Sequence, residues 1–289
     1  MKELLKGTLS EIVFFFYAHH IFSNPLKVMS VDETIDVMLN TQKSMIRFGD
    51  GEIVEIIGRS LEFQKSSEQL TDDLRRLLHY PYDGVITTVL DAFDDVSEYR
   101  INSQHYWKIH MFSFRREYYK YCDCSRIYGN SCISRPYYIF IDKSRTSGWF
   151  DKIRRIWEGK NIVVVEGEAT HNGVGNDLLD AAMKIERIIC PAKDAYGVIE
   201  DIKEKCFSFE KSKMFLVSLG PAAKPLVEAL YLAGYRALDI GNMDMEYEWF
   251  LMRASEKTVL PKHNVIGEEA NRRAGYTDYL AQIKYRIGI

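Results

Sequence analysis

Short apolar runs alternate with amphipathic stretches along the chain. The run NIVVVEG, residues 161–167, is almost continuously apolar and β-branched, which is typical of a strand buried on both faces of a parallel sheet. Similar runs, bounded by turn residues, predict further strands. They are GVITTVL (84–90), RIICPAKDAY as a strand and loop (187–196), KMFLVSLG (213–220) and RALDIGN (236–242).

Amphipathic stretches with helical spacing lie between these strands. They predict helices at DLLDAAMKI (177–185), YGVIEDIKEKC (196–206) and AAKPLVEALYLAGY (222–235). The alternation of strand and helix predicts an α/β fold with a Rossmann-like parallel sheet and helices on both faces. No repeat, low-complexity tract or linker divides the sequence, so we expect an N-terminal helical segment over residues 1–40 and a single domain over residues 41–289.

Three predicted strand ends carry unusual polar clusters. The clusters are VVEGEATHNGVGND (164–177), VSLGPAAK (217–224) and LDIGNMDMEYEW (238–249). Ligands of parallel α/β sheets bind beyond the carboxyl ends of the strands. Because three polar loops converge at that edge, the sequence predicts an active site there.

The segment RFGDGE, residues 47–52, places Asp50 and Glu52 close together. Two such carboxylates repel each other unless a positive charge lies between them, and their oxygen atoms suit Mg²⁺ or Mn²⁺. Such a cation commonly holds two phosphates of a nucleotide, and Arg47 could bind the same charge through two parallel hydrogen bonds. Gly49 and Gly51 leave the backbone free to turn. The alternative is a polar turn with solvated acids.

A glycine-containing loop follows the NIVVVEG strand. Gly173 and Gly175 precede an apparent helix start near Asp177, where backbone N–H groups favour a phosphate. The loop lacks the third glycine of a dinucleotide-binding fingerprint. The alternative is a strand-to-helix turn capped by Asn176 or Asp177. A second backbone contact to a phosphate or ribose is predicted at Gly220, where another strand ends and a helix begins.

The segment DIGNMDMEYEWF, residues 239–250, is rich in acids. If a helix begins here, Asp244 and Glu248 share one face at an i, i+4 spacing, where like charges repel unless a cation or another function is present. A solvated helix start is the alternative, because acids also suit the positive end of the helix dipole.

Composition narrows the class of protein. The chain of 289 residues has a formal charge of −3, from 38 basic and 41 acidic side chains, so charge gives no reason to expect a nucleic-acid partner. The five cysteines have no disulfide-framework pattern, and a reducing cytosol is expected. Cys122, Cys124 and Cys132 have a C-x-C-x7-C spacing without a clear fourth ligand, which does not favour zinc.

The run Ile12–Phe22 near the N-terminus is strongly apolar. It is shorter than the roughly 20 residues that span a bilayer, and it lacks the cleavage site of a signal peptide. We therefore predict a cytoplasmic protein in which this run forms a buried or interfacial helix. Contact of the run with a membrane surface or a partner protein stays open.

Six segments, in order along the chain, resemble one family of enzymes. They are IRFGDGE (46–52), ISRPYYIFIDKS (133–144), WFDKIRRIWEGKNIVVVEGE (149–168), GVGNDLL (173–179), SLGPAA (218–223) and YRALDIGNMDMEYEWFL (235–251). Together they resemble the GT-D family of bacterial glycosyltransferases. Enzymes of that family act in sugar assembly on cell-surface glycoproteins and polysaccharides.

The resemblance implies a D-x-E motif for Mn²⁺ or Mg²⁺ and a UDP-sugar donor. By position, Asp50 and Glu52 match the acids of this motif, and Arg47 belongs to it. Two positions differ from the family, since Asn242 stands where His is common and His171 where Arg is usual. The candidate nucleotide-sugar contacts are Arg47, Gly49, His171, Gly173, Gly175, Asn176, Asp177 and Gly220.

The function expected from the resemblance is metal-dependent transfer of a hexose, glucose, from a UDP-sugar to a saccharide or glycoprotein acceptor. A carboxylate would take the proton of the acceptor hydroxyl. Asp244 and Glu248 are the candidates, and Glu248 is preferred because Trp249 could exclude water from it. Ser134, Arg135 and Lys143 are further candidates for contacts to the donor or the acceptor. The alternative for each of them is a residue of a packing turn.

Two other functional classes stay open. A non-catalytic nucleotide-binding or scaffold protein would keep the fold and bind a nucleotide without turnover. An NAD-dependent oxidoreductase is less favoured, because it would need an intact G-x-G-x-x-G at the first strand–helix turn, which this sequence lacks.

Overall fold

The computed structural model describes residues 2–260, 262–263 and 275–289. Its strands pair in parallel and form one nine-stranded sheet with the order β1-β4-β3-β2-β8-β7-β5-β6-β9. Their bounds are β1 (Lys27–Val28), β2 (Ser44–Arg47), β3 (Val85–Val89), β4 (Ile127–Asn130), β5 (Asn161–Gly167), β6 (Lys184–Cys190), β7 (Met214–Ser218), β8 (Arg236–Asp239) and β9 (Ile283–Arg286).

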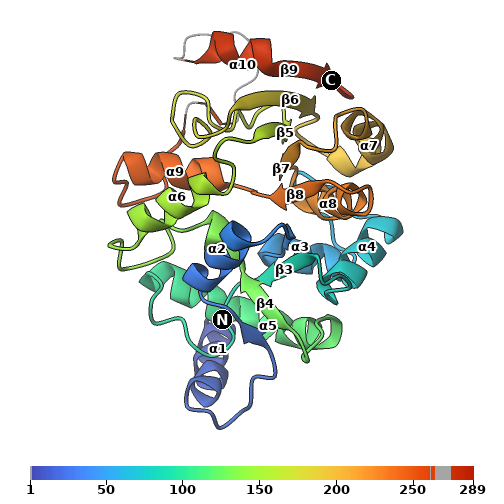
Figure 1. Cartoon of the computed structure of the whole chain (residues 1–289). Helices are drawn as coiled ribbons and strands as arrows, with labels where there is room; N and C mark the ends of the chain where they lie inside the picture. The colour runs from blue at the N-terminus through green and yellow to red at the C-terminus, as the bar shows by residue number, and fades with distance from the viewer. Residues whose placement is uncertain (1, 261, 264–274) are drawn as a thin grey trace.

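Helices cover both faces of this sheet. They are α1 (Lys2–Ala18), α2 (Val31–Asn40), α3 (Asp50–Ile56), α4 (Glu68–Leu78), α5 (Ile101–Tyr121), α6 (Thr146–Arg155), α7 (Ile199–Phe207), α8 (Ala223–Leu232), α9 (Met243–Leu251) and α10 (Tyr276–Gln282). Figure 1 shows α2, α6 and α9 on one side of the sheet and α4, α7 and α8 on the other. The predicted Rossmann-like parallel sheet with helices on both faces is confirmed.

The strands predicted from apolar runs are all present, as β3, β5, β6, β7 and β8. Residues 162–165 of β5 are completely buried. Helices on both faces of a parallel sheet exclude water from both sides of such a strand, so its sequence is continuously apolar instead of alternating. Two of the predicted helices are also present, as α7 and α8.

The prediction of a helix at residues 177–185 is wrong. Residues 177–183 form successive turns and bends, and the last two residues of the range belong to β6. The carbonyl of Leu178 accepts a hydrogen bond from the indole of Trp157 at 3.1 Å. The carbonyl of Ala181 accepts one from the N–H of Gly159 at 2.8 Å. These carbonyls therefore bind the segment that precedes β5 instead of closing helical turns.

Two of the pairings between strands that do not follow each other along the chain, β2 with β8 and β5 with β7, lie near the middle of the sheet. β2 lies between β3 and β8, and β5 lies between β6 and β7. The chain leaves the two sides of such a junction in opposite directions, which opens a crevice beyond the carboxyl ends of the strands. The polar clusters predicted from the sequence follow strands at these two junctions.

The N-terminal helix α1 packs against α5 (Figure 1). Phe14 is buried and Glu11 pairs with Lys108 at 2.7 Å, while Leu9, Ile12 and Phe15 are 43%, 48% and 55% exposed. The segment 1–40 also contributes β1, so it is not purely helical. Among the described residues, no helix has the length and apolar character needed to cross a membrane.

Candidate active site

A cavity of about 360 Å³ lies beyond the carboxyl ends of the central strands. Residues at or after the ends of β2, β3, β4, β5, β6, β7 and β8 line it, together with Trp107 of α5. The predicted residues on its wall are Arg47, Gly49, Asp50, Glu52, Gly220, Asn242 and Arg135. The cavity thus spans both junctions of the sheet.

The cations that balance the acids of the RFGDGE segment come from the protein itself. Lys224, at the start of α8, is 2% exposed and its Nζ forms an ion pair with Glu52. The same Nζ lies 3.1 Å from Oδ2 of Asp239, at the end of β8. The second oxygen of Glu52 accepts a hydrogen bond from the N–H of Gly49 at 2.8 Å, which caps α3.

Arg47 lies on the other side of Asp239. Its Nε donates to the carbonyl oxygen of Asp239 at 2.9 Å, its Nη2 lies 3.3 Å from Oδ1, and its Nη1 donates to the hydroxyl of Ser134. Burial raises the pKa of Asp239, but the charges of Arg47 and Lys224 outweigh burial and lower it overall. Asp239 is therefore ionised at neutral pH and holds both cations at the cavity wall.

Asp50 has fewer protein partners than Glu52. Its side chain accepts a hydrogen bond from the hydroxyl of Tyr106 on α5. Burial raises the pKa of Asp50, but this hydrogen bond and the positive charge of Arg135 lower it overall. Arg135 also lines the cavity and forms no ion pair with any described side chain. An ionised carboxylate and a guanidinium thus face the same space.

Asp50 and Glu52 provide the oxygen ligands that a hard divalent cation prefers. The described part of the chain contains no group of three or more His, Cys, Asp or Glu side chains that could hold a metal. Mg²⁺ at nucleotide sites is commonly held by one or two carboxylates together with substrate phosphates. The two carboxylates therefore fit a cation that binds together with a phosphate ligand.

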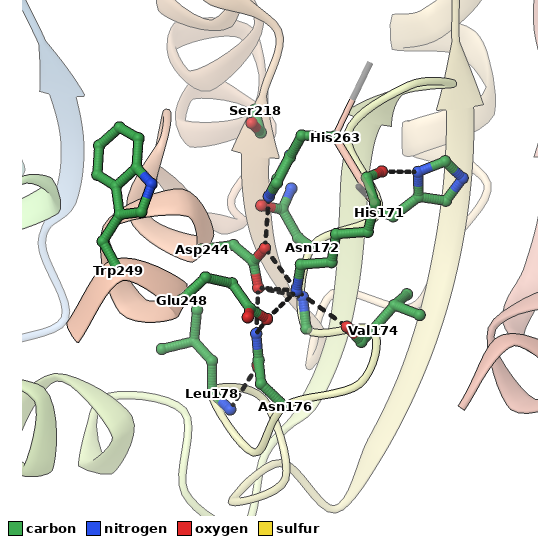
Figure 2. Close-up of polar contacts among 12 residues, drawn as sticks. His171, Asn172, Val174, Asn176, Leu178, Ser218, Asp244, Glu248, Trp249 and His263 are labelled. Carbon is green, nitrogen blue, oxygen red and sulfur yellow. Dashed lines mark hydrogen bonds and ion pairs between the residues drawn. The ribbon is translucent and has the colours of Figure 1, made fainter. Parts of the chain in front are cut away.

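Asp244 and Glu248 belong to a second group of buried and partly buried side chains, which we call the Asp244 cluster (Figure 2). Its members are Asp244, Glu248, Asn176, Lys262 and His263. The Nζ of Lys262 lies 2.8 Å from Asp244 and 2.6 Å from Glu248, and the side-chain amide of Asn176 donates to both carboxylates at 2.8 and 2.6 Å. The predicted shared face is thus present, and the cation between the acids is Lys262.

The glycine loop after β5 binds this cluster. Gly173 and Gly175 have φ angles of +73° and +76°, which favour glycine. The N–H of Gly173 donates to Oδ1 of Asp244 at 2.7 Å. Because no helix begins at Asp177, the helix-terminus argument for a phosphate at this loop is wrong, and the anion bound to Gly173 is a carboxylate of the protein.

The other residues predicted in this loop also lie outside the cavity wall. His171 is buried, with its Nδ1 2.8 Å from the carbonyl of Lys262 and its ring against Tyr279. Asp177 accepts from the hydroxyl of Tyr247 at 2.6 Å and pairs with Arg154 at 2.8 Å. His171, Asn176 and Asp177 stay predictions as nucleotide-sugar contacts, and their geometry in the described chain is that of packing residues.

Trp249 does not shield Glu248. Its indole N–H donates to the carbonyl of Thr258 at 2.9 Å, and Figure 2 shows the ring directed away from the carboxylates of the Asp244 cluster. Asp244 is completely buried and neither it nor Glu248 lines the cavity. The residue of the cluster that does line the cavity is His263.

Several residues of the site were not identified from the sequence. Lys224 and Asp239 lie inside the predicted strand-end clusters, so the sequence indicates their place at the site. It does not indicate which side chains they pair with. Tyr106 lies in a long helix, and Lys262 and His263 lie in a segment without apolar periodicity. No motif in the sequence points to these three.

Comparison with known proteins identifies the family of this site. The family described as glycosyltransferase GT-D fold matches residues 45–268, which contain both the cavity and the Asp244 cluster. The chain belongs to the GT-D glycosyltransferase family. The resemblance noted from the sequence is thereby confirmed.

Relatives of the GT-D chain carry matching names. This chain is 38% identical to the probable glycosyl transferase Gly of Streptococcus gordonii, in an alignment that covers 88% of this chain and 37% of the relative. It is 34% identical to glycosyltransferase GlyD of Streptococcus pneumoniae, over 91% of this chain and 33% of the relative. The chain therefore spans about a third of the length of these two relatives.

A solved structure shows the same fold. It is described as a new glycosyltransferase from Streptococcus sanguinis, is 36% identical, and superimposes with a TM-score of 0.84 over 91% of this chain and 100% of that chain. The arrangement of strands around the cavity is therefore that of a known glycosyltransferase structure.

Proposed function

We propose that the chain transfers a hexose, glucose, from a UDP-sugar to a saccharide or glycoprotein acceptor, with Mn²⁺ or Mg²⁺ as cofactor. The observation that carries this proposal is that two carboxylates, Asp50 and Glu52, line the same cavity as three cationic side chains. These are Arg47, Arg135 and Lys224. Membership of the GT-D family and the names of the relatives support the same reaction class.

The cationic side chains suit a diphosphate. Asp239 holds Arg47 and Lys224 in place, and Arg135 has its guanidinium free of ion pairs within the described chain. Guanidinium groups bind phosphate oxygens through paired hydrogen bonds, and an ammonium group adds a compact positive charge. The left-handed backbone of Gly220, with φ of +54° and no Cβ, lets the ring of Phe63 pack closely on it at the same wall.

Asp50 and Glu52 would hold the divalent cation. The chemistry supplied by such a cation is Lewis-acid neutralisation of the departing diphosphate. Tyr106 orients Asp50, and Lys224 and the Gly49 N–H orient Glu52. These contacts keep both carboxylates at the cavity wall before any ligand binds.

Part of the cavity lining is apolar and would suit a nucleobase. Phe63 is 47% exposed and packs so closely on Gly220 that a Cβ at Gly220 would lie 2.9 Å from its ring. Leu61 and Leu219 lie on the same wall. A planar base such as uracil can stack on an exposed ring of this kind. The role in cell-surface glycan or glycoprotein assembly is proposed from the relatives' family.

Turnover of a donor panel tests this function. The purified chain is incubated with Mn²⁺, saccharide acceptors and a series of UDP-sugars, and the products are identified by mass spectrometry. We expect transfer from UDP-glucose and release of UDP. Binding of UDP without release of sugar from any donor would favour the non-catalytic nucleotide-binding alternative.

A further inference from the structure

His263 joins the Asp244 cluster to the cavity. Its Nε2 lies 2.8 Å from Oδ2 of Asp244, and its side chain lines the same cavity as Asp50 and Lys224. The carboxylates of the cluster do not reach the cavity wall, and the side chain of His263 is 7% exposed. Of the described members of the Asp244 cluster, His263 is thus the one that both lines the cavity and bonds Asp244.

The state of Asp244 determines which nitrogen of His263 carries a proton. Burial raises the pKa of Asp244, but the hydrogen bond from His263 and the charge of Lys262 lower it overall, to about 2. The carboxylate is thus ionised at neutral pH and only accepts hydrogen bonds. Nε2 of His263 must donate, and Nδ1 of the neutral ring is left as a proton acceptor. No described residue donates a hydrogen bond to Nδ1.

The rest of the cluster keeps Asp244 in this orientation. Its Oδ1 accepts hydrogen bonds from the N–H of Gly173, from Asn176 and from Lys262, at 2.7, 2.8 and 3.1 Å. Asp244 and Glu248 carry two negative charges against the single positive charge of Lys262. The remaining negative charge stabilises an imidazole that gains a proton, as a buried carboxylate does in other acid–base pairs.

We propose that His263 takes the proton of the acceptor hydroxyl during sugar transfer and that Asp244 is its positioning residue. This inference rests on the proposed glycosyltransferase function. It moves the role of base from Glu248 and Asp244, which do not line the cavity, to the side chain that does.

Sugar transfer forms one bond at the anomeric carbon and breaks another. The acceptor oxygen forms a bond to the anomeric carbon of the donor sugar, and its proton moves to Nδ1 of His263. The bond between the anomeric carbon and the diphosphate oxygen breaks, and the electron pair leaves with the nucleoside diphosphate. The imidazolium then releases its proton to water, which returns the ring to the neutral form.

The variant His263→Gln tests this role with little change in shape. The glutamine amide can still donate a hydrogen bond to Asp244 in place of Nε2, but it has no acceptor with the basicity of Nδ1. We expect kcat for transfer from UDP-glucose to fall ~100-fold or more, the usual effect of a lost general base. The Kd for UDP, measured by calorimetry, should stay within about threefold of the unchanged protein.

A matched control and a rescue experiment separate chemistry from folding. His79→Gln replaces an exposed histidine at the end of α4 and should leave kcat unchanged. His263→Ala should lose activity and regain part of it when free imidazole is added. Asp244→Asn, which lets Nδ1 take the ring proton instead, should lower kcat at least ~10-fold without changing the Kd for UDP.

Each outcome decides the proposal. Transfer by His263→Gln at the normal rate overturns it, and so does a loss of kcat confined to Glu248→Gln. Loss of UDP binding in His263→Gln also overturns it, because His263 would then be a donor contact. If the unchanged protein transfers no sugar, the proposed function fails first and the role of His263 falls with it.

Discussion

The Nζ of Lys224 lies 3.1 Å from Oδ2 of Asp239, and the two side chains are only 2% and 1% exposed. The same ammonium pairs with Glu52, so one buried cation pairs with two carboxylates, one from α3 and one from β8. A buried ion pair of this kind contributes little compared with a well-packed apolar core, but removing one partner leaves an uncompensated buried charge.

Lys224→Met should therefore destabilise the fold strongly. Arg47 still pairs with Asp239 in this variant, so we expect a loss near the lower end of the range for broken buried pairs, about 3 kcal/mol. The measurement is the free energy of unfolding in urea. Lys203→Met, which removes an exposed pair with Glu200, is the control and should unfold at the same urea concentration as the unchanged protein. Equal midpoints for both variants would show that the buried pair does not stabilise the fold.

Asp244 should make the fold sensitive to acid. Its pKa in the folded chain is about 2, below the ordinary value of about 3.9 in an unfolded chain. A depressed carboxyl pKa adds stability above the unfolded value, and this stability is lost as the pH falls through the folded value. The contribution is about 2 kcal/mol and should disappear between about pH 4 and pH 2.

Unfolding free energies at pH 5 and pH 3 check this assignment. The unchanged protein should lose more stability between the two pH values than Asp244→Asn does, because the variant has no carboxyl at this position. Asp180→Asn, at an exposed position, serves as the control and should follow the unchanged protein. The same acid sensitivity in Asp244→Asn would assign the effect to other carboxylates.

The sequence predicted the sheet because burial on both faces leaves a clear pattern. The four residues 162–165 of β5 are fully buried, and no polar side chain interrupts them. The segment 177–185 shows the opposite case. Its apolar residues have helical spacing, but Trp157 and Gly159 take its carbonyl groups, and neither partner can be identified from the segment alone. Tertiary hydrogen bonds there outweigh local propensity.

The partners of the site acids could not be predicted for a related reason. Asp50 and Glu52 signal that a positive charge is needed, but Lys224 is 172 residues away from Glu52 along the chain. Asp244 and Glu248 signal the same need, and Lys262 comes from a segment without any periodic pattern. Carboxylate pairs are visible in a sequence, whereas the fold decides whether a lysine, a metal or water balances them.

The two acids of the RFGDGE segment should respond differently to substitution, because their protein contacts differ. Asp50 has Tyr106 as its one side-chain hydrogen-bond partner in the described chain. Glu52 forms an ion pair with Lys224, and it accepts the hydrogen bond from the Gly49 N–H that caps α3. If a divalent cation binds with the donor diphosphate, Mn²⁺ should strengthen UDP binding to the unchanged protein. In Asp50→Asn this gain should vanish while the melting temperature stays close to normal. In Glu52→Gln the gain should vanish and the melting temperature should also fall.

Calorimetry of UDP with and without Mn²⁺, together with thermal unfolding of the ligand-free proteins, measures both effects. Equal UDP affinity with and without Mn²⁺ in all three proteins would remove the cation from the proposed function and leave Arg47, Arg135 and Lys224 as the diphosphate site.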